Sequence, residues 1–133
     1  MSIITPDEFR RIWQGSLDDA LCKIPRSAFS PYQIPEDALN FLEISGLPKG
    51  AAPFLSFTPL LIENKLIRIN DYYSTFPMDK TYLLIGGDGA GNPICIAEGT
   101  GKIYLLDHDN DCMVQFMNSS VPQLAKCLLL CRH

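Results

Sequence analysis

Apolar residues near the amino terminus recur with the period of an α-helix. Phe9, Ile12 and Trp13 fall on one face of that helix. Thr5 and Glu8 have the spacing of a capping box, in which each side chain accepts a hydrogen bond from the other residue's backbone N–H. The pattern therefore predicts a short amphipathic helix that begins after Thr5 and buries an aromatic face.

A second helical pattern begins near Pro35. Glu36 and Asp37 lie in its first turn, where the positive end of the helix dipole favours acidic side chains. Gly46 is the expected carboxyl-terminal cap of this helix. Between the two helices, residues 18–30 include a short helical possibility around Asp19 to Lys23, but Pro25 and the following Pro31 predict turns and loops.

Strand patterns replace the helical ones from residue 54 onward. Short segments rich in β-branched and aromatic residues are separated there by turn-forming residues. Six strands are predicted, with a single one between residues 58 and 81: Phe54–Thr58, Leu66–Asn70, Thr81–Gly86, Pro93–Ala97, Lys102–Asp107 and Met113–Met117. Alternation predicts that one face of their antiparallel meander packs against helices through Leu83, Ile85, Ile94, Ile96, Ile103 and Leu105.

The last predicted element is a helix that is apolar nearly all round. Leu124, Leu128 and Cys131 form one stripe along it, but Cys127 and Leu130 lie off that stripe. Such a helix needs cover on more than one side. Either another element of the same chain supplies the cover or a second copy does, in which case the protein is a homodimer.

Length and composition fit one α+β domain. The chain has 133 residues, of which 47% are hydrophobic and 20% charged. Helices, then strands, then a closing helix predict a single α+β domain over residues 1–133 with a six-stranded, mainly antiparallel sheet.

The net charge of −4 argues against direct binding of nucleic acid and suits a basic protein partner. Membrane-span and secretion-signal patterns are absent, so we expect no membrane contact and a cytoplasmic location.

Few residues suggest catalysis, and none suggests a metal or a cofactor. Cys127 and Cys131 lie four residues apart, but the sequence offers no second pair to complete a metal site. The glycines of residues 86–91 match no nucleotide-binding motif. His108 lies between two aspartates and would be the base of a hydrolase, yet the sequence assigns no nucleophile to it. We therefore do not expect an enzyme.

Acidic turns form the first candidate surface for partner binding. Asp107, Asp109 and Asp111 occupy alternate positions of one turn, and Asp88 lies in a glycine-rich turn. Three carboxylates within five residues repel one another, and a basic partner would relieve that repulsion. A solvated turn between strands is the simpler interpretation of these aspartates, and a contact surface for a basic protein partner is the functional alternative.

Aromatic residues form the second candidate surface. Tyr72, Tyr73 and Phe76 cluster in one connection between predicted strands. Aromatic side chains on a connection can anchor an interface, because they bring a large contact area at a low entropy cost. They can equally pack under the connection into the core, and the sequence favours neither interpretation.

Five motifs in a fixed order resemble the SUKH superfamily. They are Ile34–Asp37, Gly46–Pro48, Tyr82–Gly89, Thr100–Asp109, and Asn118–Ser120 before the closing helix. The resemblance extends over roughly residues 34 to 130. It is to the Smi/Knr-like branches and, more closely, to the fourth SUKH group.

This resemblance implies an α+β fold with a central, curved, mainly antiparallel sheet flanked by helices, and no catalytic centre. Bacterial members of the superfamily are mostly immunity proteins of polymorphic or contact-dependent toxin systems. They bind a cognate toxin, often a nuclease or deaminase, and block it in the cytoplasm. The superfamily also includes eukaryotic signalling proteins, so a general protein–protein interaction module without a toxin partner is the alternative.

Overall fold

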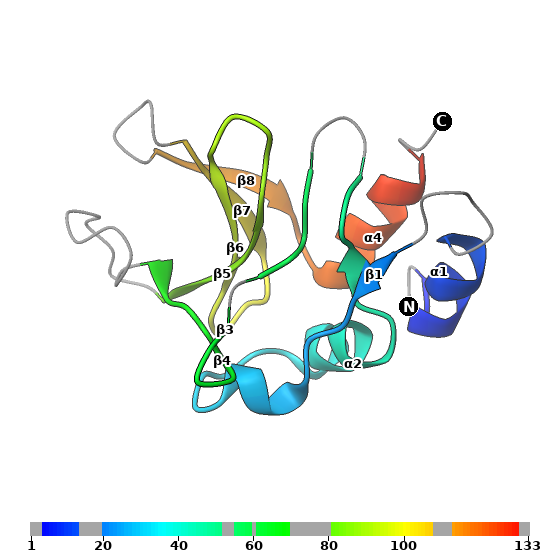
Figure 1. Ribbon diagram of the computed structural model, residues 1–133, viewed down its shortest axis with the longest axis horizontal. Coiled ribbons are helices and arrows are strands. Elements are labelled where there is room, and N and C mark those ends of the chain that lie inside the picture. Colours follow the sequence, from blue (N-terminus) through cyan, green and yellow to red (C-terminus); the bar gives the residue numbers. More distant parts are fainter. Residues whose placement is uncertain are drawn as a thin grey trace.

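In the computed structural model, the three α-helices that the structure describes in full lie on one side of an antiparallel sheet (Figure 1). The helices are α1 (Pro6–Trp13), α2 (Glu36–Ile44) and α4 (Val121–Leu130). The sheet has four strands in the order β5 (Tyr82–Gly87), β6 (Pro93–Ala97), β7 (Ile103–Asp107) and β8 (Met113–Asn118). The structure describes residues 4–13, 20–51, 55–59, 61–69, 81–107 and 113–130. The predicted α+β class is confirmed.

Two short strand pairs and a 3₁₀ helix are also present among the described residues. β1 (Leu21–Cys22) pairs with β2 (Leu47–Pro48), and β3 (Leu61–Ile62) pairs with β4 (Lys65–Leu66), both antiparallel. A 3₁₀ helix, η1 (Arg26–Phe29), precedes α2. The expectation that residues 18–30 contain only turns and loops was therefore wrong.

The capping box of α1 is confirmed. The Thr5 backbone N–H donates to Glu8 Oε1 at 3.0 Å, and the Glu8 backbone N–H donates to Thr5 Oγ1 at 3.1 Å. Phe9 and Trp13 are buried, as predicted, but Ile12 is 47% exposed. The buried face of α1 is therefore narrower than the apolar pattern indicated.

These hydrogen bonds predict a pH dependence for α1. They lower the pKa of Glu8 below its ordinary value of 4.5, so the ionised carboxylate stabilises the folded state. That stabilisation is present above pH 4.5 and is lost as the pH falls through the lowered pKa of the folded state. In urea titrations the excess stability of the wild type over Glu8→Gln should therefore shrink between pH 6 and pH 3. An excess that does not change with pH would contradict the role of the carboxylate charge.

The predicted six-stranded sheet was wrong in its first two strands. Ser56 forms a single bridge with Gly87, and Arg68 forms a single bridge with Leu83, so both segments touch β5 without becoming full strands. Glu63 and Asn64 both have positive φ, 53° and 65°, and turn the chain back on itself between β3 and β4. Residues of this segment pair with one another there instead of extending along β5. The single strand predicted between residues 58 and 81 is thus replaced by a hairpin and a bridge.

Both faces of the sheet are apolar. The predicted inward face is confirmed: Leu83, Ile85, Ile94, Ile96 and Ile103 are buried in one cluster with the helices, and Leu105 packs against it. On the other face lies a second buried cluster of Ile69, Tyr82, Cys95, Ala97 and Leu106. The alternation of apolar residues predicted the face toward the helices correctly, but it did not indicate that the residues on the opposite face are also buried.

The closing helix α4 is covered partly by its own chain. Leu124, Ala125 and Leu128 are buried in the cluster that also contains α1 and α2 residues. Leu130 is 69% exposed and Cys127 is also exposed. Intramolecular packing therefore accounts for one stripe of α4, and the predicted homodimer stays a prediction at this point.

Candidate partner-binding surface

Two of the predicted acidic residues lie at the same end of the sheet. Asp88 follows Gly87, which pairs with Pro93 of β6, and Asp107 is the last residue of β7. Since β6 separates β5 from β7, the two aspartates are two strand spacings apart, about 10 Å. We call this region the acidic end and define it as residues 55–59, 87–93 and Asp107. The antiparallel meander brings these residues together although they are distant in sequence.

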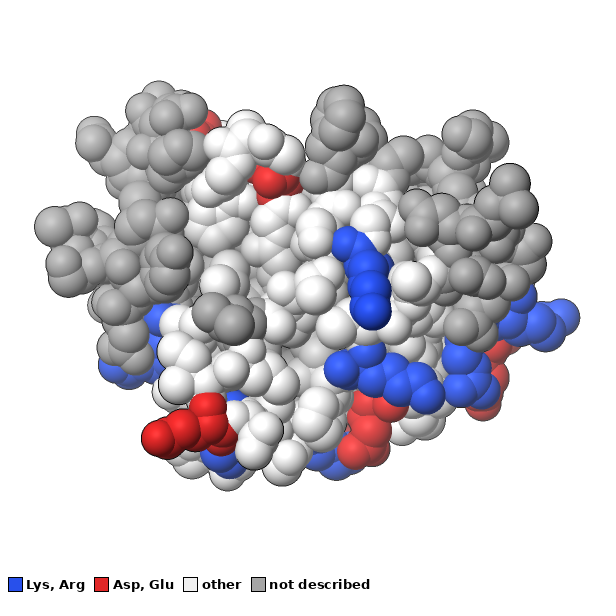
Figure 2. All heavy atoms as spheres, in the orientation of Figure 1, with Lys and Arg blue, Asp and Glu red and all other residues white. Residues whose placement is uncertain are grey.

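Figure 1 shows where this end lies, and Figure 2 shows its charged atoms. The turn between β5 and β6 and the far end of β7 lie at the top of the view in Figure 1. In Figure 2 the same upper part carries acidic atoms and no basic atoms among the residues that the structure describes. Residues 55–59 and 87–93 also contain no lysine or arginine. Among the described residues, this end therefore carries two carboxylates and no basic side chain.

Asp88 holds the turn between β5 and β6. Its Oδ1 atom accepts hydrogen bonds from the backbone N–H groups of Ala90 and Asn92, at 2.8 and 2.9 Å. Its Oδ2 atom accepts a third from Asn92 Nδ2 at 3.0 Å. The charge of Asp88 is consequently fixed in position, and part of its role is to shape the turn.

Two adjoining hollows flank Asp88. They share a wall of Leu84, Gly86, Gly87 and Asp88, and the larger measures about 320 Å³. Ile67 and Pro59 line the larger hollow, and Ile69 and Pro93 line the smaller one. Most of the lining is apolar, and Asp88 is the one ionisable side chain among the described lining residues. The residues that line the two hollows come from three separate segments of the chain, so no single sequence motif could have predicted them.

The remaining predicted contact residues lie outside the described residues. They are Asp109, Asp111, Tyr72, Tyr73 and Phe76.

The structure shows an aromatic row on the sheet face opposite the helices. The Tyr104 ring lies 5.4 Å from the Tyr82 ring and 5.8 Å from the Phe116 ring. Each of these aromatics lies on a different strand, β5, β7 or β8, so only the pairing of the strands brings them together and no pattern within one strand could have revealed the row.

One ion-pair cluster lies away from the acidic end. Arg26 of η1 binds Glu36 and Glu43, which both belong to α2. The guanidinium lowers the pKa of Glu36, and the two carboxylates raise the pKa of Arg26. This cluster fixes η1 against α2. The carboxylates of Glu36 and Glu43 therefore already have an ion-pair partner within the chain.

A comparison with models of known protein families identifies the family of this chain. The family model described as SUKH-4 immunity protein matches residues 9–133. The chain belongs to the SUKH-4 immunity protein family. The resemblance drawn from the motifs is therefore confirmed, and the match extends it at the amino-terminal side to include most of α1. No curated protein and no solved structure matches the chain.

The described residues of this SUKH-4 protein offer little to catalysis. Among them, no group of three or more His, Cys, Asp or Glu side chains could hold a metal ion. Burial raises the pKa of the Cys95 thiol, and it also raises that of Cys22, so neither thiol is activated as a nucleophile. None of the helices in the described part is long and apolar enough to span a membrane. The acidic end, with its hollows, is the most distinctive site that the structure describes in this family member.

Proposed function

We propose that this SUKH-4 protein neutralises a cognate toxin of a bacterial polymorphic or contact-dependent system by binding it directly in the cytoplasm. The observation that carries the proposal is the family match over residues 9–133. Binding alone blocks the toxin, so one immunity protein is used for each toxin molecule and no catalytic residue is needed. A nuclease or a deaminase that acts on nucleic acid fits this scheme, because proteins that hold phosphates tend to be basic.

The acidic end is the surface that we assign to the toxin. The described residues hold equal numbers of acidic and basic side chains, so the excess negative charge comes from segments 14–19, 70–80 and 108–112. Segment 108–112 directly follows Asp107. Opposite charges on the toxin would speed the encounter, and the hollows beside Asp88 would receive side chains of the toxin.

Co-expression with the toxin tests the function. The probe is the carboxyl-terminal domain of the large secreted protein encoded beside this gene, produced in bacteria with and without the SUKH-4 chain. We expect growth arrest without the chain, and growth and a one-to-one complex with it. No toxin gene beside this one, or arrest despite equal expression of both proteins, would favour a general interaction module instead.

A titration separates binding from catalysis. Toxin activity should fall linearly with added SUKH-4 protein and reach zero at one molar equivalent. It should not change further with incubation time, because each molecule blocks a single toxin. Complete inactivation at a small fraction of an equivalent would instead show that the chain acts as an enzyme.

Removing charge from Asp107 and from the segment that directly follows it should slow toxin binding. The variant Asp107→Asn, Asp109→Asn, Asp111→Asn is expected to lower the association rate constant several-fold at low salt and to flatten its salt dependence. Stopped-flow or surface-plasmon kinetics at two salt concentrations measure both effects. The matched control is Asp7→Asn, Asp37→Asn, Glu63→Gln, which removes the same charge from α1, α2 and the β3–β4 turn. Equal rates for the two variants would rule out this turn as the steering surface.

A further inference from the structure

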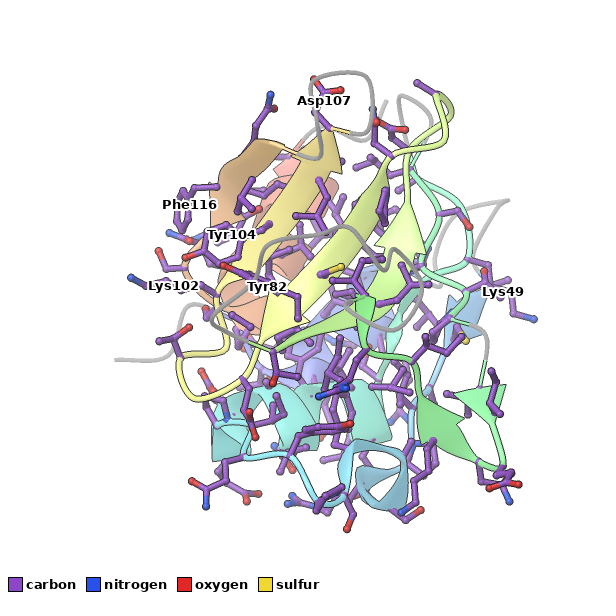
Figure 3. The ribbon with its side chains drawn as sticks, turned by 90° about the vertical axis from the view of Figure 1, so that its left-hand side faces the viewer. Lys49, Tyr82, Lys102, Tyr104, Asp107 and Phe116 are labelled. Carbon is purple, nitrogen blue, oxygen red and sulfur yellow. The ribbon has the colours of Figure 1, made fainter. Side chains whose placement is uncertain are left out.

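We draw no further inference here: the strongest candidate, the apolar patch that exposed Val114 and Phe116 of β8 form on the sheet face opposite the helices (Figure 3), carries none, because nothing among the described residues shows what covers it.

Discussion

Gly46→Ala is expected to lower the free energy of unfolding by more than about 3 kcal/mol. Gly46 ends α2 with φ at +77°, and its backbone N–H donates to the Phe41 carbonyl at 3.0 Å. A Cβ atom at this position would lie 2.1 Å from the Cys22 carbonyl oxygen and 2.7 Å from the Lys23 nitrogen. Both atoms belong to the backbone, so neither can rotate away. The substitution thus adds a clash to the strain of a left-handed backbone.

The clash would separate β1 from the end of α2. Cys22 pairs with Leu47 in the β1–β2 ladder, and the Ile24 N–H donates to the Leu42 carbonyl at 2.9 Å. Moving Cys22 away would break both contacts. Because typical domains are stable by only about 5 to 15 kcal/mol, a loss of this size is a large fraction of the total.

Substitutions at two other glycines distinguish the effect of backbone strain from the effect of a steric clash. Gly99 has φ at +88°, but nothing lies within 4 Å of its added Cβ, so Gly99→Ala should lose only about 1 kcal/mol. Gly50 has open space and no left-handed backbone, so Gly50→Ala should be neutral or slightly stabilising. Urea unfolding followed by the fluorescence of buried Trp13 measures all three variants. If Gly46→Ala and Gly99→Ala lost equal stability, the close approach to Cys22 would be contradicted.

Local signals predicted most of the elements. The capping box at Thr5, the glycine that ends α2 and the four strands from Tyr82 to Asn118 each depend on residues close in sequence. Hairpin turns join consecutive strands, so strand order follows directly from chain order. The position of Asp88 and Asp107 at one end of the sheet follows from that order as well.

Long-range pairing could not be predicted. β1 and β2 are two residues each and lie 25 positions apart, which is too short for any period to appear. Glu63 at positive φ is equally without a local signal, because non-glycine residues rarely take this conformation. The hollows beside Asp88 depend on where residues 55–59 and 67–69 cross β5. Such crossings are set by tertiary packing rather than by sequence pattern.

The second large effect on stability is expected at Phe41, and exposed Phe116 is the matched control position. Phe41 is fully buried, its ring lies 5.5 Å from that of Phe9, and Phe9 stacks on Trp13 at 5.6 Å. Phe41→Ala should therefore lower the free energy of unfolding by about 3 to 5 kcal/mol. It should also shift Trp13 fluorescence to longer wavelength, because α1 packs on α2 through these rings.

Phe116→Ala removes the same number of atoms from an exposed site and should lower the free energy of unfolding by less than about 1 kcal/mol. Its side chain is 57% exposed, and its ring centroid lies 5.8 Å from that of Tyr104, so little buried area is lost. Urea unfolding followed by the fluorescence of Trp13 measures both variants. Equal losses for Phe41→Ala and Phe116→Ala would contradict both the core position of Phe41 and the outward position of Phe116.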